Sequence, residues 1–278
     1  MKQPRTVDKI FAGQVSIDGA GVRLQRLFGY HEASLFDPFL LLDYFGSDRP
    51  EDYRNGFPWH PHRGIETITY MIEGSCEHGD SLGNMGVIAT GDVQWMTAGS
   101  GIIHQEMPQG DEKGRMFGFQ LWANLPSTHK MMAPRYRDIK DNAIPRVRLA
   151  NGIEIRIICG TVDGVRGPAE DVVIDPEYLD VYLPAQTEFS RPLPAGHTAF
   201  IAVFKNGLRV ADAAVGQGAV ALLKQGDFLT VQALEKPARF LLVSGKPLKE
   251  PIAWRGPIVM NTQEELAAAF QAFNNGTF

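Results

Sequence analysis

The sequence predicts an all-β protein in which two barrels follow one another and a short α-helix ends the chain. Short alternating apolar runs separated by glycines fill residues 60–122, and no helical period interrupts them. The second half repeats the first in weakened form, because the hairpin signal of residues 89–92 (ATGD) returns at residues 224–227 (KQGD). A helix-start pattern appears only near the end, at residues 262–265 (TQEE). These three observations favour tandem β domains closed by one helix.

Composition excludes several classes of protein. The chain has 278 residues, 44% hydrophobic and 21% charged, and no apolar run approaches the length of a membrane span. Its formal charge of −5 and the absence of a basic cluster disfavour direct binding to nucleic acid. The two cysteines, Cys76 and Cys159, are too few for a disulfide framework and suit small buried thiols. The polar start carries no secretory signal, so we expect a cytoplasmic location, or a nuclear one if the source is eukaryotic.

The strand signals can be followed along the chain. Short strands with glycine turns are expected over residues 15–44, and residues 46–58 are rich in turn formers and predict a loop. Further strands are expected in the ranges 66–73, 87–89, 93–96, 116–122, 153–158, 181–183, 198–204, 219–223, 228–231 and 239–243. We therefore place a first barrel in residues 1–134, a charged linker in 135–145 and a second barrel in 146–278, with a helix at about 262–274.

Two pairs of polar residues fall where the first barrel should be apolar. His60 and His62 are two residues apart, as are His104 and Glu106, so in extended strands each pair projects from one face. Counting by alternation, Glu66 shares the inward face of the first pair. Three imidazoles and a carboxylate are costly to bury without an ion, so the pattern predicts a metal site in which spacing alone does not choose between Glu66 and Glu106. Nitrogen and oxygen donors suit Fe(II), Mn, Ni, Co, Cu or Zn.

The remaining histidines and the second barrel predict no further site. A lone histidine is more often a hydrogen-bonded core residue than a ligand, and we interpret the other four in this way: His31, His78, His129 and His197. Counting the repeat offsets places Leu193 and Ala195 where the first barrel has His60 and His62. The expected stoichiometry is therefore one divalent metal per chain.

Several longer motifs resemble the pirin family of the cupin superfamily. They are residues 37–43 (DPFLLLD), 60–67 (HPHRGIET), 91–108 (GDVQWMTAGSGIIHQEMP), 121–126 (LWANLP) and 256–262 (GPIVMNT). The resemblance covers nearly the whole chain and implies two tandem cupin (jelly-roll-like) barrels. It also implies an iron site in the first barrel, held by His60, His62, His104 and Glu106. The general cupin pattern would use Glu66 as the carboxylate, whereas pirins use the later one. Glu66 then orients an imidazole or is a hydrogen-bonded carboxylate at the barrel end.

The resemblance associates the chain with quercetin 2,3-dioxygenase activity and, in eukaryotic members, with transcriptional co-regulation. Our first hypothesis is a dioxygenase that cleaves quercetin or a related aromatic enol with O2, with Glu106 also serving as the base. The alternative is a non-catalytic regulator that depends on the metal or its redox state and acts through protein partners. A roomy pocket ending at the ion would favour the enzyme, whereas a metal sealed by Trp59, Trp95 and Met107 would favour the regulator.

Overall fold

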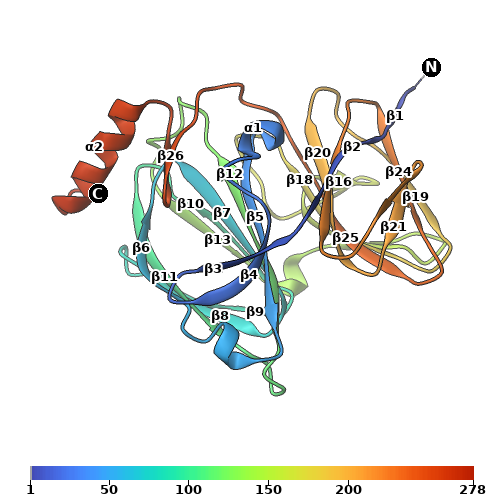
Figure 1. Cartoon of the computed structure of the whole chain (residues 1–278), viewed down its shortest axis with the longest axis horizontal. Helices are drawn as coiled ribbons and strands as arrows, with labels where there is room; N and C mark the ends of the chain where they lie inside the picture. The colour runs from blue at the N-terminus through green and yellow to red at the C-terminus, as the bar shows by residue number, and fades with distance from the viewer. Residues whose placement is uncertain (1) are drawn as a thin grey trace. The chain divides into compact units, whose positions relative to one another are not determined.

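The computed structural model describes residues 2–278 and consists largely of β-strands (Figure 1). Contacts divide it into two compact units. The N-terminal unit contains residues 15–33, 39–141 and 248–278, and the C-terminal unit contains residues up to Gln14 together with 34–38 and 142–247. The short helix α1 (Ala33–Phe36) includes the point, between residues 33 and 34, at which the chain passes from the N-terminal unit to the C-terminal unit. The all-β prediction is confirmed.

The N-terminal unit is built from two antiparallel sheets. The larger has the order β13 (Arg135–Ile139), β10 (Val93–Thr97), β7 (Ile65–Glu73), β12 (Met116–Asn124), β5 (Phe39–Ser47), β4 (Val22–Phe28) and β3 (Gln14–Asp18). The smaller has the order β6 (Phe57–His62), β11 (Ile102–Gln109), β8 (Ser75–Asp80) and β9 (Met85–Ala89). The 3₁₀ turns Pro50–Asp52 and Asp141–Ala143 and the hairpin of β26 (Ala253–Arg255) and β27 (Ile258–Met260) complete it. The inner faces of the two sheets enclose a cavity.

The C-terminal unit also has two main sheets, around an apolar interior. The larger has the order β14 (Arg146–Arg148), β15 (Glu154–Cys159), β18 (Glu177–Leu183), β25 (Ala238–Gly245), β20 (Thr198–Lys205), β23 (Ala219–Leu223) and β2 (Val7–Ala12). The smaller joins β1 (Pro4–Arg5), β24 (Phe228–Ala233), β21 (Leu208–Val210), β22 (Ala213–Val215) and β19 (Glu188–Pro192), and β16 (Thr161–Val162) pairs with β17 (Val165–Arg166). Leu193, Leu242 and other buried apolar side chains fill the core, and the one group of potential metal ligands found in residues 2–278 lies in the other unit.

The division by contacts differs from the predicted domain boundaries at three places. Strands β1 and β2 pair with β24 and β23, so the start of the chain folds into the C-terminal unit. Residues 135–139, predicted as linker, form the edge strand β13 on β10; charged side chains that resemble a linker also suit a strand edge exposed to water. The C-terminal helix packs in the N-terminal unit. Each difference depends on a pairing between segments distant in sequence.

The terminal helix itself matches its sequence signal. Helix α2 spans Gln263–Asn274, with Thr262 as its N-cap. The Thr262 hydroxyl accepts from the Glu265 backbone N–H, and the Glu265 carboxylate accepts from the Thr262 N–H, which completes the capping box. Leu266 and Ala269 are its buried residues and pack against the β26–β27 hairpin. The predicted helix is confirmed.

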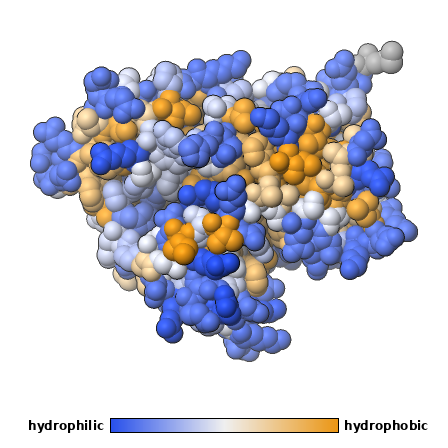
Figure 2. All heavy atoms as spheres, viewed as in Figure 1, coloured by the Kyte–Doolittle hydropathy of each residue, from blue (hydrophilic) through white to orange (hydrophobic). Residues whose placement is uncertain are grey.

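On the face shown in Figure 2 polar residues predominate, and apolar residues gather in patches between them. Met85 is 85% exposed and Ile17 is 71% exposed, but single exposed apolar side chains are usual on proteins. No helix within residues 2–278 is long and apolar enough to cross a membrane.

Candidate metal centre and its cavity

Three histidines meet where β6 lies beside β11. His60 and His62 come from β6, and His104 of β11 pairs directly with His60 across the antiparallel ladder. Their ring nitrogens lie within 4.8 Å of one another, and no other such group of potential metal ligands occurs in residues 2–278. The spacing of two residues within each strand therefore places these imidazoles together, as the sequence predicts.

The hydrogen bonds of His60 and His62 leave two lone pairs facing each other. His60 Nδ1 lies 2.9 Å from the Pro58 carbonyl oxygen, and His62 Nδ1 lies 3.2 Å from that of Pro257. A carbonyl can only accept, so each Nδ1 carries the proton and each Nε2 has a lone pair. The two Nε2 atoms are only 3.0 Å apart, an unfavourable contact unless a cation lies between or beside them. Carbonyls that fix the outer nitrogen are also typical of metal-binding histidines.

His104 gives independent support for a metal. It is 1% exposed, and neither of its ring nitrogens has a hydrogen-bond partner within residues 2–278. A buried polar atom without a partner is costly, and a metal ion would remove that cost. Burial lowers the pKa of His62 and His104 well below the ordinary value, and neighbouring histidines lower it further. Both rings are therefore held in the neutral form that binds metals. The residues present fit a divalent ion.

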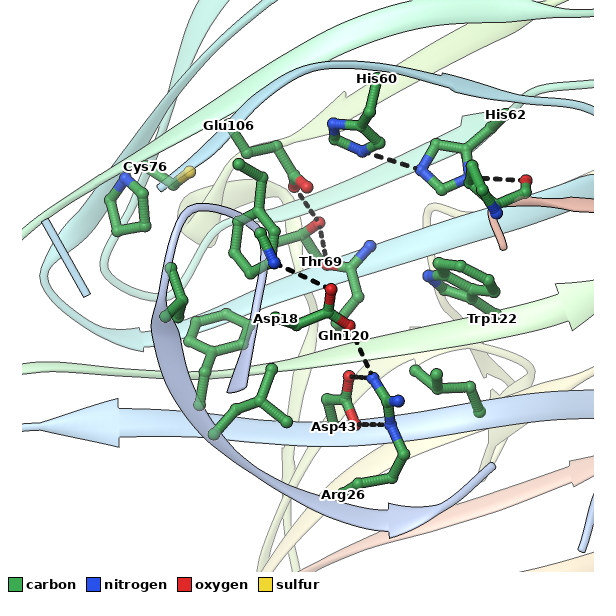
Figure 3. Close-up of a pocket in the computed structure, with 18 of the residues that line it drawn as sticks. Asp18, Arg26, Asp43, His60, His62, Thr69, Cys76, Glu106, Gln120 and Trp122 are labelled. Atoms are coloured by element: carbon green, nitrogen blue, oxygen red, sulfur yellow. Dashed lines mark hydrogen bonds and ion pairs between the residues drawn. The ribbon is translucent and has the colours of Figure 1, made fainter. Parts of the chain in front are cut away.

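Glu106 lines the same cavity but does not belong to the compact group of three histidines. A bulge interrupts the β6–β11 ladder between His104 and Glu106, and the carboxylate accepts a hydrogen bond of 3.1 Å from the Thr69 hydroxyl. Burial raises the pKa of Glu106, while the neighbouring His60 and the bond from Thr69 oppose that shift. Figure 3 shows the Glu106 carboxylate directed toward Thr69. A buried carboxylate with a raised pKa beside the histidines suits both ligation and proton transfer.

Glu66 does not share the face of His60 and His62, so the alternation argument is wrong at this point. Its carboxylate accepts from the Thr97 hydroxyl at 2.6 Å, and it is absent from the cavity lining, whereas Thr69 is present. The reason is a break in the strand. β6 ends at His62 and belongs to the smaller sheet, whereas β7 begins at Ile65 and belongs to the larger one.

The other histidines lie outside the three-histidine group. His78 is buried on β8 opposite Glu106, and its ring stacks on Tyr136 at 5.9 Å between centroids. Neither nitrogen of His78 makes a hydrogen bond within residues 2–278, so it is buried as expected but is not the hydrogen-bonded residue that was predicted. His31 is exposed and His129 is half-buried, so the prediction of a core residue is wrong for both, whereas His197 is buried in the C-terminal unit as expected.

The segment after β26 supports the histidines from one side. The Pro257 carbonyl accepts a hydrogen bond from His62 Nδ1. In the next strand, β27, the Val259 N–H donates to the Arg63 carbonyl at 3.1 Å, beside His62 in sequence. Trp254 of β26 and Gly256, which follows that strand, line the cavity. Part of the wall of the candidate site therefore comes from residues almost 200 positions beyond His62 in sequence.

A buried lysine fastens this segment to the turn after His62. Lys130 is 2% exposed, and its ammonium group donates to the carbonyls of Gly64 and Val259, both at 2.9 Å, and to the Asn124 side-chain oxygen at 2.7 Å. Burial lowers the pKa of Lys130 to about 7, while distant carboxylates oppose the shift. Three acceptors match the three N–H bonds of an ammonium group. Nothing in the local sequence of residues 126–132 indicates this role.

The cavity lined by His60, His62 and Glu106 has a volume of about 570 Å³, and His104 is not among its lining residues. One wall is aromatic: the ring centroids of His62 and Trp122 are 5.1 Å apart, and those of Trp122 and Trp254 are 5.9 Å apart. The rest of the lining includes apolar residues such as Leu24, Phe45 and Met116, together with a short polar row (Figure 3). This volume is in the range of pockets that hold small organic ligands.

The chain matches two family profiles and several known proteins. The profile described as Pirin matches residues 21–123, and that of the Pirin C-terminal cupin domain matches residues 178–278. A pirin-like protein of Caulobacter vibrioides is 47% identical over 99% of both chains. Human pirin is 39% identical over 93% of this chain and 88% of its own. The chain in the crystal structure of a quercetin 2,3-dioxygenase from Acinetobacter baumannii is 34% identical, with a TM-score of 0.92. The match covers 99% of this chain and 98% of that one.

Proposed function

Because the chain belongs to the pirin family of the cupin superfamily, we propose that it is a mononuclear metal-dependent dioxygenase that cleaves quercetin or a related flavonol with O2. One observation carries the proposal: a cavity of about 570 Å³ with an aromatic wall is lined by His60 and His62 of the three-histidine group and by Glu106. Trp59, Trp95 and Met107 are absent from the cavity lining, so they do not form the seal that would favour a regulator. The similarity to the Acinetobacter enzyme supports the choice of substrate class.

His60, His62 and His104, with Glu106 as the fourth ligand, would hold one divalent ion, which we propose is Fe(II). When bound, the ion would supply Lewis acidity that lowers the pKa of a substrate hydroxyl, and open positions for substrate and O2. The ligand assignment of Glu106 rests on the family resemblance and on its place in the lining, since its carboxylate is directed to Thr69.

The protein's own groups account for binding and for proton transfer. The faces of Trp122 and Trp254 offer a surface on which the flat rings of a flavonol can stack. The Glu106 carboxylate, which lines the same cavity, would take the proton of the enol hydroxyl. Thr69 holds that carboxylate by its hydroxyl, and the apolar lining keeps bulk water from the deprotonated substrate.

Oxygen uptake tests the proposal directly. Protein loaded anaerobically with Fe(II) is mixed with quercetin and then exposed to air, while flavonol absorbance, O2 and released carbon monoxide are followed. We expect O2 uptake matching flavonol loss, and no uptake for His104→Ala. Separate loading with Mn, Ni, Co, Cu and Zn identifies the metals that support the reaction. Anaerobic quercetin binding followed by no oxygen uptake with any of these metals would contradict the proposal.

A further inference from the structure

A row of polar side chains crosses the cavity floor, in register on four neighbouring strands. Arg26 on β4 pairs with Asp43 on β5, Asp43 with Gln120 on β12, and Gln120 with Thr69 on β7. Directly opposite residues in a sheet point to the same face, so all four project into the barrel. Thr69 contacts Glu106 at the metal end, and Arg26 lies three strand spacings away, roughly 14 Å. The row therefore leads from the candidate metal centre to a second polar region.

That second region consists of one guanidinium between two carboxylates. Arg26 donates from Nε and Nη2 to Asp43 at 2.9 and 2.8 Å, and from Nη2 to Asp18 at 3.0 Å. Asp43 is buried, whereas the Asp18 side chain, which comes from the end of β3, is 53% exposed. All three residues line the cavity, and Figure 3 shows them on the side away from His60 and His62.

Several hydrogen-bonding positions of this row have no protein partner within residues 2–278. Arg26 Nη1 has no acceptor there, because its three recorded bonds all use Nε and Nη2. The Gln120 amide lies 2.7 Å from the Thr69 hydroxyl, whose single proton serves either Gln120 or Glu106. In either case one end of the amide bonds Thr69 and the other end has no protein partner there. The Asp18 oxygens each accept one bond, from Gly19 N–H and from Arg26, and each has a second lone pair. The row can thus both donate to and accept from a ligand in the cavity.

The balance of charge decides which polar ligand groups suit this region. Arg26 is the one cationic side chain among the cavity-lining residues, against the carboxylates of Asp18 and Asp43. Burial opposes the charge on Arg26, but the bonds and charges of the two aspartates outweigh it and raise its pKa, so the guanidinium stays charged. A ligand carboxylate would add a third negative charge around one cation, which is unfavourable. A neutral hydroxyl group donates to Asp18 and accepts from Arg26 or Gln120 without that cost.

We propose that Asp18, Arg26 and Gln120 form a subsite that selects flavonols bearing hydroxyl groups on the ring remote from the metal-binding oxygens, and that it discriminates against ligands with a carboxylate there. The inference rests on the proposed function, because it assumes that the enol end of the ligand lies at the histidines. The apolar residues between the two polar ends, such as Leu24 and Phe45, then contact the faces of the rings. The subsite explains why a cavity with mostly apolar walls keeps charged groups at its far side.

Binding without turnover tests the subsite. Zinc-loaded protein is titrated anaerobically with quercetin, 3-hydroxyflavone and 3-hydroxyflavone 4′-carboxylate, and binding is read from quenching of the fluorescence of Trp122 and Trp254, which line the cavity. We expect quercetin to bind about tenfold more tightly than 3-hydroxyflavone, since a net gain near 1.4 kcal/mol corresponds to one or two hydrogen bonds. The carboxylate is expected to bind more weakly than 3-hydroxyflavone.

Two variants and a control separate the subsite from general effects on binding. Asp18→Asn removes one negative charge from a half-exposed side chain and should reduce the penalty on the carboxylate several-fold. Gln120→Met should lower quercetin affinity several-fold while leaving 3-hydroxyflavone affinity unchanged. Asp48→Asn, at an exposed residue outside the cavity lining, should match the parent protein. Arg26 is not changed because its loss would leave Asp43 buried without its cation.

The outcomes distinguish the two proposals. Equal affinities for quercetin and 3-hydroxyflavone in the parent protein would overturn the subsite while leaving flavonol binding in place. An Asp18→Asn protein in which the affinity of the carboxylate relative to 3-hydroxyflavone is unaltered would do the same. Failure of all three flavonols to bind the metal-loaded protein would overturn the proposed function, and the subsite with it.

Discussion

Replacing Lys130 by methionine should destabilise the N-terminal unit, because three buried oxygens lose their donor at once. The ammonium group is 2% exposed and bonds the Gly64 and Val259 carbonyls and the Asn124 side chain. Bonds to a charged donor contribute roughly 1.5 to 3 kcal/mol each, a gross loss of about 5 to 9 kcal/mol. The variant no longer buries an ammonium ion, which returns several kcal/mol. We expect a net loss of about 2 to 4 kcal/mol, comparable to removal of one partner from a buried network.

Urea and thermal unfolding of Lys130→Met measure this loss. A change of 2 to 4 kcal/mol corresponds to a fall in Tm of roughly 4 to 16 °C for a unit of this size. Lys113→Met is the matched control, since Lys113 is exposed in the loop after β11 and should change stability by no more than about 0.5 kcal/mol. Metal affinity should fall as well, because the lysine fastens Gly64 beside His62. A Lys130→Met protein as stable as Lys113→Met would refute the reasoning.

Three further predictions concern the ligands, the stoichiometry and the pH dependence. Glu106→Ala should lower metal content strongly, whereas Glu66→Gln should change metal affinity less than about tenfold. Competition with a chelator measures both affinities. If the Glu66→Gln protein held less metal than the Glu106→Ala protein, Glu66 rather than Glu106 would be the ligand. Metal analysis should find one ion per chain and no change in His197→Ala, so two ions would require a second site. Burial raises the pKa of Asp43 to about 6, against the lowering effect of Arg26. The folded protein therefore binds the Asp43 proton more tightly than the unfolded chain does. The stabilisation from this proton is present below pH ~4 and is lost as the pH rises through 6. Urea unfolding from pH 4 to 7 should therefore show a fall of up to roughly 3 kcal/mol that is absent in Asp43→Asn, and equal slopes would contradict it.

The sequence predicts the parts of the fold that depend on residues close together in the chain. Short, largely apolar runs bounded by turn residues identify strands such as β10 and β20, and the capping box at Thr262 identifies α2. The parts that it misses depend on partners far away. The pairing of Arg5 with Leu229 assigns the start of the chain to the C-terminal unit, and the pairing of β13 with β10 makes a strand of a charged segment. Hydrophobic pattern alone contains no information about such partners.

The candidate site divides in the same way. The shared face of His60 and His62 could be predicted because two-residue spacing on one strand needs no knowledge of a neighbouring strand, whereas the approach of His104 depends on the pairing of β11 with β6. The polar row could not be predicted, because Arg26, Asp43 and Gln120 acquire a common face only through the register of three strands. The role of Lys130 could not be predicted either, because two of its three acceptors, at Gly64 and Val259, are distant from it in sequence.

The failure of the alternation argument at Glu66 follows from the feature that gives the cavity its two sides. Gly64 has φ of +79°, and a Cβ there would come within 2.0 Å of the Val259 carbonyl oxygen, so the bend requires glycine. At this bend the chain leaves the smaller sheet after His62 and enters the larger sheet at Ile65. A continuous strand would have placed the histidines and the following residues on one wall. The break instead sets the imidazoles on one sheet and Thr69 on the other, where its hydroxyl reaches Glu106 across the cavity. A glycine inside an apparently continuous alternating run therefore indicates that the inward and outward faces must be assigned separately before and after it.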